Sequence, residues 1–567
     1  MSKTVYRGNP SENKGLRPSG VRGLPGLGGT GVDPNVAREE RETLITCTFY
    51  DGTTLQYRGN PEEAIDWDEV VEEYAEPSDQ ADNPRPSSGN RAHGTAQQSS
   101  KHKGRAAEPN PDALWHTPNR EAWATVGGKH YPVQSDEFRH WLAGRYYACN
   151  KEPASGYKLD ELVNANAAEA LFKGPEHRVH LRTARQGDTI WLDLADEEGR
   201  AVRIDKEGWH VVPASKVMPK FCRPPNMRPL PEPLQDEADA SQLRSVLNLP
   251  DEKAYRLLLT WLSFAMVPDK PYPIVAVSGP AGAAKSSFAE FVRTAIDPNE
   301  VPLVGMPRRE DLPAFAKNNP VLCFDNLSTI QPHLADELCR LATGGGLGGR
   351  RLYTNDGEAT FNARRPVVLT GINDVATRGD LADRTIVIRL EKIPEIGRRT
   401  DADVREAFGH AHPGILASLL EMVVMGLRRL GDVTRERRRL PRMADFAEWG
   451  FAVAPAIGWS ADDFASAYWA NRNDAFEAAI EDDPIAQPIL SMLEGREQKV
   501  WQGTTLQLLT KLKGPLGDVA RAPGFPPSPV ALGKALSRIE PALAARGVSM
   551  HRERVTAGTR ITLQMSG

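Results

Sequence analysis

The chain has 567 residues and a formal net charge of −5 at pH 7, so it can hold several hydrophobic cores, and any nucleic-acid surface must be local. Its five cysteines are odd in number and include no close pair, which argues against a disulfide framework or a zinc ribbon. No apolar run approaches the ~18 residues needed to span a bilayer, so we expect a cytoplasmic protein without a membrane anchor.

The first 112 residues divide by composition. Residues 1–42 are rich in glycine and proline, which is typical of a disordered arm, and residues 77–112 have the polar composition of a linker. Between them, residues 43–76 contain two β-prone runs around Asp51-Gly52 and then an acidic segment. We expect a small hairpin followed by an acidic helix.

Residues 113–235 predict an α+β accessory domain. Helical periodicity covers 137–147 and 159–171. Strand-like runs follow at 177–183, 189–193, 201–204 and 209–212. Asp193 and Asp196 suggest a metal-binding carboxylate pair, but the adjoining Asp-Glu-Glu-Gly sequence favours a solvated turn instead.

The most informative stretch is IVAVSGPAGAAKSS at 274–287. A buried strand ends at a loop of small residues, and a helical pattern follows, which is the context of a phosphate-binding loop. Backbone N–H groups of such a loop surround the phosphates, while Lys285 reaches the β/γ oxygens and Ser286 offers its hydroxyl to Mg²⁺. The alternative is an ordinary strand-to-helix turn. The expected nucleotide-binding residues are Gly279, Pro280, Ala281, Gly282, Ala283, Ala284, Lys285, Ser286 and Ser287, with Ala284 replacing the usual glycine.

Two further strands end in polar residues. The run 321–324 leads into Asp325, which we expect to hold Mg²⁺ together with Ser286. Asn326 follows where many ATPases have a glutamate. The run 366–370 ends in Thr370, the expected sensor of the γ-phosphate, with Asn373 in reserve; a simple helix cap is the alternative for both.

Arg384 immediately precedes a fourth strand, 385–390. A guanidinium at this position of a subunit edge would stabilise charge on the γ-phosphate bound by a neighbouring subunit. The alternative is a surface ion pair. Asp336 and Glu337, on the helix after the second strand, are candidate bases, but surface charge is their expected role.

The ordered motifs GPAGAAKSS, VLCFDNLS, RRPVVLTGI and DLADR resemble the AAA+ core of superfamily 3 helicases and related replication ATPases of phages and mobile elements. The resemblance implies a multidomain α/β protein with a P-loop core at 240–395 and a helical lid at 396–480. It also implies ATP and Mg²⁺ as ligands, a homo-oligomeric ring, usually a hexamer, and movement on single-stranded DNA.

A Gly-rich segment at 343–361 contains Asn355-Asp-Gly, a turn signal that predicts a hairpin. In the family that this chain resembles, a hairpin here grips DNA in the ring pore, which makes Arg350 and Arg351 candidate DNA contacts. The alternative is that both arginines pair with acidic residues at a subunit contact. In the lid we expect helices at 401–410, 413–430, 442–457 and 460–477.

The C-terminal region is locally basic. From residue 496 onward, eleven Lys/Arg face four Asp/Glu, a surplus of 11 − 4 = 7. Helical patterns at 504–511 and 528–546 precede two strand-like runs, so we expect a winged helix at 481–567 that binds duplex DNA rather than docking a protein. The expected contacts are Lys534, Arg538, Arg552, Arg554 and Arg560.

The sequence therefore predicts an ATP-dependent DNA-translocating or unwinding motor in mobile-element replication, whose N-terminal region contacts a replication partner. The alternative is an ATP-gated DNA-binding switch without unwinding activity, which Asn326 favours. A primase function of 113–230 has weak support, since no clear carboxylate triad is present.

Overall fold

The computed structural model describes residues 4–7, 43–49, 54–59, 110–350, 358–361, 364–372, 374, 378–434, 440–514, 524–555 and 558–566. It divides into two compact units, Met1–His102 and Lys103–Gly567. In the first unit, β1 (Thr4–Arg7) pairs in parallel with β2 (Thr43–Phe49), and β2 pairs antiparallel with β3 (Thr54–Gly59). The β2–β3 pairing agrees with the predicted hairpin, while the expected acidic helix lies outside the described residues.

The second unit begins with a small sheet that the sequence analysis missed. Its strands have only four or five residues, which is too short for a clear alternation of apolar and polar positions. They are β4 (Ala113–His116), β5 (Ala122–Val126) and β6 (Lys129–Pro132). Helix α2 (Asp136–Asn150) packs beside β6, and α3 (Gly156–Phe172) packs on β4 and β5.

A second sheet of the accessory domain is antiparallel, in the order β11-β10-β9-β8. Its strands are β8 (Thr183–Gln186), β9 (Thr189–Asp193), β10 (Ala201–Ile204) and β11 (Trp209–Val212). Ile190, Leu192, Val202 and Ile204 on one face join the main hydrophobic core. Nearby, β7 (Val179–His180) pairs in parallel with β12 (Lys220–Phe221).

The sequence analysis expected Asp193 to lie in a solvated turn, but the residue is buried. Its side chain is 1% exposed and forms an ion pair with Arg223, whose Nη2 lies 2.5 Å from Oδ1. Asp196 instead pairs with Arg200 at 2.6 Å. Both carboxylates are thus held by arginines, and no group of three or more metal-binding side chains occurs in the described ranges.

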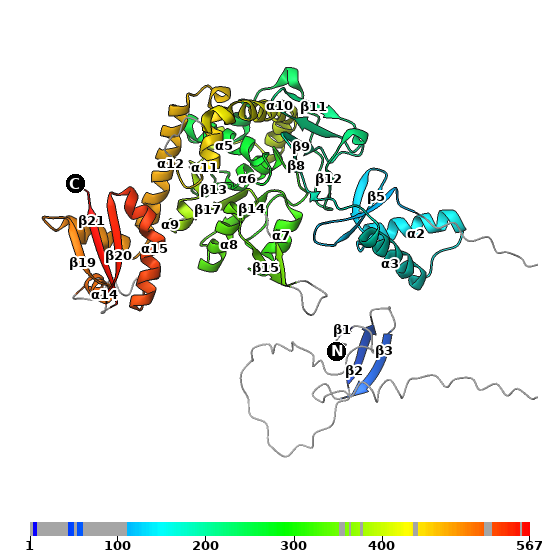
Figure 1. Cartoon of the computed structure of the whole chain (residues 1–567), viewed down its shortest axis with the longest axis horizontal. Helices are drawn as coiled ribbons and strands as arrows, with labels where there is room; N and C mark the ends of the chain where they lie inside the picture. Colours follow the sequence, from blue (N-terminus) through cyan, green and yellow to red (C-terminus); the bar gives the residue numbers. More distant parts are fainter. Residues whose placement is uncertain are drawn as a thin grey trace, which may run out of the picture. The chain divides into compact units, whose positions relative to one another are not determined.

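The central domain contains a four-stranded parallel sheet in the order β14-β17-β13-β18. Figure 1 labels β13, β14 and β17. The strands are β13 (Ile274–Ser278), β14 (Leu322–Leu327), β17 (Val367–Gly371) and β18 (Thr385–Arg389). All residues of β13 and β17 are buried, as expected for a parallel sheet covered on both faces. The polar residues that end these strands therefore meet at one edge.

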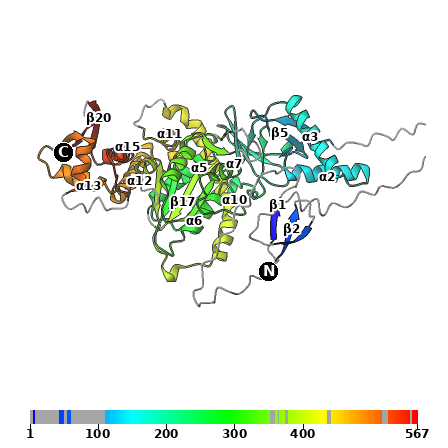
Figure 2. The ribbon, with the colours of Figure 1, turned by 90° about the horizontal axis from the view of Figure 1, so that it is seen from below.

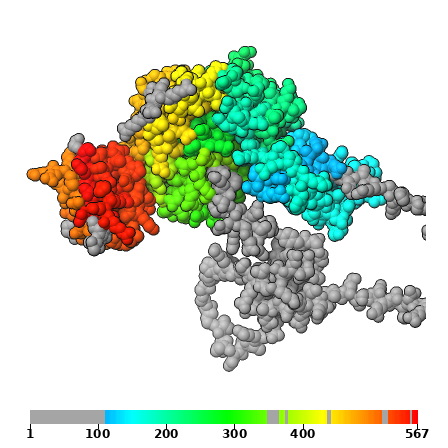
Figure 3. Space-filling model, in the orientation of Figure 1, coloured from blue at the N-terminus to red at the C-terminus, as the bar shows by residue number. Residues whose placement is uncertain are grey.

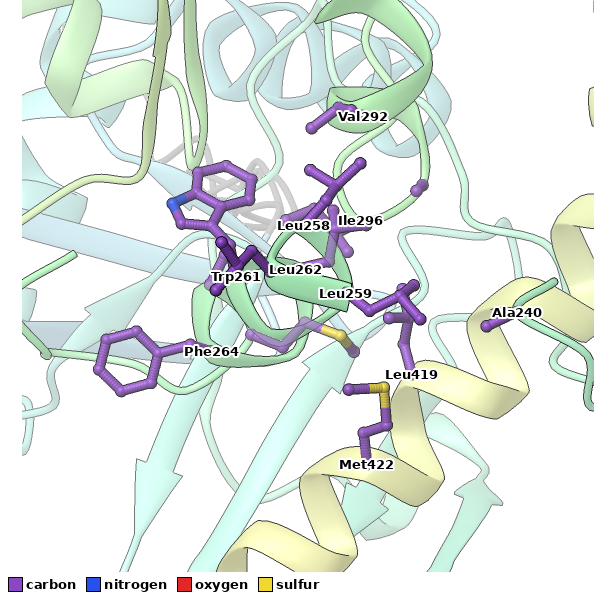
Figure 4. Packing of buried hydrophobic residues seen from close by; sticks show 14 of the residues in the cluster. Ala240, Leu258, Leu259, Trp261, Leu262, Phe264, Val292, Ile296, Leu419 and Met422 are labelled. Carbon is purple, nitrogen blue, oxygen red and sulfur yellow. The ribbon is translucent and has the colours of Figure 1, made fainter. Parts of the chain in front are cut away.

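Helices cover this sheet, and α5 and α6 lie beside it in both views (Figures 1 and 2). They are α4 (Gln242–Val246), α5 (Glu252–Ala265), α6 (Lys285–Thr294), α7 (Leu312–Asn318), α8 (Pro332–Thr343) and α9 (Gly379–Ala382). Asp251 caps α5 by accepting from the Ala254 N–H at 2.7 Å. The apolar side chains of α5 pack against α10 and the end of α6 (Figure 4).

The lid contains one long helix where the sequence analysis expected two. Helix α10 (Asp401–Val433) continues through Pro413, although proline removes a helical hydrogen bond and usually kinks or ends a helix. Phe408 and Ala411 before Pro413, and Ile415 and Leu416 after it, are all buried in the main core. Packing on both sides of the proline therefore outweighs its local cost. The lid continues with α11 (Ala444–Val453) and α12 (Ala461–Asp482).

The C-terminal residues gather in a lobe of their own, coloured orange to red in Figure 3. The elements are α13 (Ala486–Glu494), β19 (Val500–Thr504), α14 (Thr505–Lys513), α15 (Pro529–Ala545), β20 (Val548–Val555) and β21 (Gly558–Met565). The strands form one antiparallel sheet in the order β19-β21-β20. The sequence analysis predicted α14, α15, β20 and β21 but missed α13 and β19.

Membrane-spanning helices and cysteine pairing can be assessed for the described residues. None of the helices there combines the length and apolar character required to cross a membrane. The four cysteines in the same ranges, Cys149, Cys222, Cys323 and Cys339, are free.

Candidate functional site

The loop between β13 and α6 contains three residues with positive φ. Gly279 and Gly282 have φ values of 151° and 82°, and a Cβ on Gly279 would lie 2.4 Å from the carbonyl oxygen of Leu390. Ala284 also has positive φ, at 61°, which costs an L-residue about 1–2 kcal/mol relative to glycine. This position is where the usual motif has glycine, so the departure noted in the sequence is tolerated at the cost of local strain.

The N-terminus of α6 points into this loop. Ala284 is the N-cap residue, and no side chain caps the helix, so the first backbone N–H groups remain available for an anion. Lys285 Nζ donates to the carbonyl oxygens of Gly279 at 2.8 Å and Pro280 at 3.0 Å. The loop therefore combines free N–H groups, the positive end of a helix dipole and an ammonium group.

Side chains from three elements meet at the carboxyl edge of the sheet. Ser286 Oγ on α6 donates to Asp325 on β14, with distances of 3.0 Å to Oδ1 and 2.9 Å to Oδ2. Thr370 at the end of β17 donates its hydroxyl to Asp325 Oδ1 in a very short hydrogen bond. Three expected site residues are thereby brought into one hydrogen-bonded group.

Asn326 turns the chain sharply within β14. Its φ is 58°, the register with β17 shifts between Phe324 and Leu327, and its backbone N–H donates to Thr370 Oγ1 at 2.9 Å. Its exposed side chain is an amide, which cannot accept a proton from water as a carboxylate does.

The sequence analysis missed a second group that holds the loop. Ser278 Oγ donates to Asp374 Oδ1 at 2.5 Å, and Arg389 pairs with Asp374 Oδ2 at 2.8 Å. Asn248 Nδ2 donates to the carbonyl oxygens of Ala283 at 3.1 Å and Glu391 at 2.6 Å. These partners lie 96 and 35 residues from the loop residues they bind, so no local spacing revealed them.

An arginine finger requires an exposed side chain, and Arg384 is buried. The residue is 9% exposed, and its Nη1 donates to the carbonyl oxygen of Asp380 at 2.5 Å. Its Nε is buried without a hydrogen-bond partner among the described residues. The guanidinium would have to leave this position to reach a neighbouring subunit, so the finger role stays a prediction.

The two acids on α8 differ in their surroundings. Asp336 pairs with Arg378 at 2.9 Å. The sequence analysis expected Glu337 to be a surface charge, but the residue is only 4% exposed. Its Oε1 accepts hydrogen bonds from Arg309 and Arg340, each at 2.8 Å. A buried carboxylate held by two arginines is a structural ion-pair cluster rather than a free base.

Two expected DNA contacts, Arg350 and Arg351, and the reserve sensor Asn373 belong to or adjoin the segment after α8. Strands β15 (Leu347–Arg350) and β16 (Glu358–Phe361) pair antiparallel, in agreement with the predicted hairpin. The Arg350 side chain, Arg351 and Asn373 lie outside what the structure describes.

The C-terminal domain has an open cavity of about 620 Å³ between α14, α15 and the β20–β21 hairpin. Its lining includes Lys534, Ser537 and Arg552, and Arg552 Nη1 donates to Ser537 Oγ at 2.5 Å. Arg554 is exposed, and Arg560 pairs with Glu553 at 3.5 Å. Lys534 and Arg552 therefore line one basic groove, whereas Arg560 lies opposite Glu553 in the hairpin, on the other face of the strands from Arg552.

Arg538, also on α15, does not line this groove. The α15 backbone at Arg538 lies against α9, because a Cβ on Gly379 would meet the Arg538 carbonyl oxygen at 2.4 Å. The Arg538 charge also lowers the pKa of Asp483, a carboxyl whose pKa is raised on balance by burial. Arg538 therefore faces the junction with the central domain and does not join Lys534 on the basic groove.

Comparison with known proteins matches two consecutive regions to one kind of protein. Residues 240–476 match the family described as actinomycete integrative conjugative element replication protein. Residues 485–566 match the C-terminal domain of the same replication proteins. The loop, the Ser286–Asp325–Thr370 group and the lid all fall within the first match, and the basic groove falls within the second. No curated protein matches the sequence.

Solved structures give weaker likenesses. The apo A form of the NrS-1 C-terminal region has 10% identity over 80% of this chain and 96% of its own, with a TM-score of 0.37. SCCmec type IV Cch, titled an active helicase, has 12% identity over 67% and 77%, with a TM-score of 0.40. A JCV helicase has 12% identity over 37% and 66%, with a TM-score of 0.19. Likenesses at this level assign no function.

Proposed function

We propose that this protein is an ATP-driven motor that translocates on or unwinds DNA during replication of a mobile element. The match of residues 240–476 to a replication-protein family supports the biological setting. The observation that carries the chemistry is the convergence of Lys285, Ser286, Asp325 and Thr370 at one edge of the parallel sheet. This is where ligands bind in open α/β sheets.

The residues present fit a Mg²⁺–nucleotide complex. Ser286 and Asp325 offer a hydroxyl and a carboxylate, the oxygen ligands that Mg²⁺ prefers. When bound, Mg²⁺ would neutralise charge on the β and γ phosphates. The chain itself would bind the phosphates through the N-terminus of α6 and Lys285, while the Thr370 hydroxyl would orient groups at the γ-phosphate.

DNA would be held away from the nucleotide. The groove with Lys534 and Arg552 lies on the domain whose element order is helix, strand, helix, helix and two strands, which suits the predicted winged helix. This domain packs through α15 against α9 and α12 of the central domain. α9 immediately precedes β18, so a physical link joins the groove to the sheet that carries the loop.

A pure ATP-gated switch is the second candidate, and one observation favours it. Asn326 supplies an amide at the position after Asp325, where it cannot act as a general base. Without such a base, hydrolysis would be slow and the protein would remain in its nucleotide-bound state.

Three measurements on the purified full chain test these proposals. ATP binding is measured first, for the wild type and for Lys285→Ala, which should lose it. ATP turnover is then measured with and without single-stranded DNA. Strand displacement on a forked duplex separates the candidates, because ATP-dependent unwinding excludes the pure switch. If the wild type fails to bind ATP at millimolar Mg²⁺, both candidates are excluded.

A further inference from the structure

The accessory domain contains a second cavity, which none of the sites described above uses. It measures about 450 Å³ and lies on the antiparallel sheet β8–β11 and the segment that follows β11. Its lining includes Trp191, Arg203, His210, Lys216 and Met218. A cavity of this size matches typical small-ligand sites and is large enough for one or two nucleotides of a longer chain.

Strand register explains why three of these residues share one face. Trp191 on β9 lies opposite Arg203 on β10, and Arg203 lies opposite His210 on β11. Directly opposite residues of antiparallel strands point to the same face, and neighbouring strands are about 4.8 Å apart. Trp191, Arg203 and His210 therefore form one row across three strands, roughly 10 Å long.

The other face of the same sheet cannot hold a ligand, because it is part of the main core. Val202 and Ile204 pack there, and the neighbouring Trp209 donates its Nε1–H to Glu421 of α10 at 2.9 Å. On the cavity face, Trp191 packs in a small apolar cluster with Ala201, Val212 and Phe221. The row is therefore buried at Trp191 and becomes more exposed toward Arg203 and His210.

Trp191 is the buried member of the row. The residue is 5% exposed, and its indole Nε1 is buried without a hydrogen-bond acceptor among the described residues. A buried donor left without an acceptor costs about 1–3 kcal/mol. Trp191 also lines the cavity, so its ring forms part of the cavity wall while its N–H stays enclosed.

The remaining lining groups indicate the charge of the occupant. Arg203 and Lys216 are cationic, and only Asp205 offsets them, through an ion pair with Arg203 at 3.1 Å. His210 is exposed, and Met218 is 64% exposed, which leaves a planar ring and an apolar side chain available to a base. An anionic ligand with flat apolar parts fits this combination, and the open surroundings suit a chain that passes through better than an enclosed small molecule.

We propose that the row Trp191–Arg203–His210, with Lys216, binds the sugar-phosphate backbone of single-stranded DNA. This inference rests on the proposed function of the protein as a DNA motor. Arg203 and Lys216 contact phosphates, and His210 and Met218 contact a base. The accessory domain would then hold a single strand beside the central domain, whose α10 contacts the same sheet.

Photocrosslinking of the full-length protein tests this proposal. The probe is an oligo-dT of about 16 nucleotides, the upper site size of one single-strand-binding fold, with 4-thiothymidine at several positions. Crosslinked peptides are identified by mass spectrometry. We expect a crosslink within residues 203–218 that unlabelled oligo-dT removes. Crosslinks found in the C-terminal domain alone would overturn the proposal, as would removal of the crosslink by free dTMP but not by oligo-dT.

Variants sharpen the result. Arg203→Ala/Lys216→Ala should weaken oligo-dT binding at least about fivefold and lower the slope of log affinity against log salt by about 1.4, since each lost phosphate contact contributes about 0.7. Lys173→Ala, an exposed lysine on the same domain, is the control.

The outcome of the DNA-binding test can be distinguished from the outcome of the ATP-binding test. ATP binding by the double variant is measured in parallel and should equal that of the wild type, because none of these residues contacts the loop. A double variant that binds oligo-dT with unchanged affinity and salt slope refutes the accessory site, whatever the ATP result. If the wild type does not bind ATP, the motor proposal is refuted, and the crosslink alone then decides whether the accessory site binds DNA.

Discussion

The Ser286 hydroxyl donates to both carboxylate oxygens of Asp325, at 3.0 and 2.9 Å. The two residues lie 39 positions apart, at the start of α6 and near the end of β14. β14 is separated from β13 in the sheet by β17, whose Thr370 also binds Asp325. This edge of the sheet is therefore built from β14, β17 and the helix that follows β13, and we expect a change at any of its members to affect the same step of the proposed reaction.

Ser286→Ala and Asp325→Ala should each lower ATP turnover at least about 100-fold, a typical loss when one stabilising group of a reaction site is removed. Both residues offer oxygen ligands to Mg²⁺, so the apparent Mg²⁺ requirement should also rise. Steady-state ATP hydrolysis across a Mg²⁺ titration checks this. Turnover within twofold of the wild type for Asp325→Ala would contradict the site assignment.

Asn248→Ala should weaken ATP binding about tenfold without abolishing it. The side-chain amide holds two carbonyl oxygens, those of Ala283 in the loop and Glu391, and loss of a net hydrogen bond or two costs about 1–2 kcal/mol. The loop would then be less ordered before it binds phosphate. Titration with a fluorescent ATP analogue measures the effect, and Asn248→Asp, whose carboxylate would face two carbonyl oxygens without a donor, should weaken binding at least as much as the alanine variant.

Arg384→Ala tests whether this arginine acts within or between subunits. The side chain is buried and donates to the Asp380 carbonyl oxygen, so its loss should lower the free energy of unfolding by roughly 1–3 kcal/mol. On this basis we expect a destabilised protein whose activity is not restored by mixing.

The decisive control for Arg384 is a mixture of Arg384→Ala and Lys285→Ala subunits. A finger that acts between subunits would let an Arg384→Ala subunit supply the intact loop and its partner supply the arginine. Recovery of turnover in the mixture, together with normal thermal stability of Arg384→Ala, would therefore establish the finger role. Chemical denaturation and ATP turnover of the same samples give both readouts.

Stability should fall as the pH falls below about 6.5, and His412 is one cause. Burial lowers the pKa of His412 to about 4, whereas its ordinary value is 6.5. Between these values the unfolded chain binds a proton that the folded chain does not, so the folded state loses up to about 1.4 kcal/mol per pH unit. Above pH 6.5 both states are neutral, and His412 gives no pH dependence.

His412→Gln should reduce this slope without removing it. His412 Nε2 donates to the Ala295 carbonyl oxygen at 3.2 Å, and glutamine retains an N–H donor. The pKa of His130 is also lowered to about 4, first by burial and then by nearby positive charges, so some slope remains. Urea unfolding at pH 5 and pH 7.5 measures the difference. An unchanged slope in His412→Gln would show that His412 is not buried in its neutral form.

Lys534→Ala and Arg538→Ala form a matched pair on α15. Lys534 lines the basic groove, whereas Arg538 faces Asp483 and α9. Lys534→Ala should weaken duplex binding and lower its salt slope by about 0.9, the contribution of one phosphate contact. Arg538→Ala should leave that slope unchanged. Fluorescence anisotropy at several salt concentrations separates the two, and equal slopes for both variants would contradict this division of α15.

The parts of the site that could be predicted were those that local order controls. A β-branched run, a loop of small residues and a following helix identified Lys285 and Ser286, because a phosphate loop is one continuous segment. Asp325 and Thr370 were identified because each ends an apolar run, and parallel strands bring their carboxyl ends to one edge. Asp374, Ser278 and Asn248 follow no such rule and were missed.

Burial was the main source of error. Glu337 and Asp193 are charged, and charged residues are rarely buried unless they are paired. Their partners Arg309 and Arg223 lie 28 and 30 residues away and come close only when separate segments pack. Pro413 led to a wrong helix boundary for a related reason. Proline usually ends a helix, but packing on both sides of Pro413 keeps α10 continuous.

The sequence by itself determined the strand, loop and helix from β13 to α6, the polar residues near the ends of β14 and β17, and the basic character of the C-terminal region, because each depends on neighbouring residues. Only the tertiary structure decided that Arg384 is enclosed, that Arg538 faces the central domain, and that Trp191, Arg203 and His210 form a row. These facts depend on strand register and on packing between distant segments, where the energy of burial is settled by contacts that no short stretch of sequence contains.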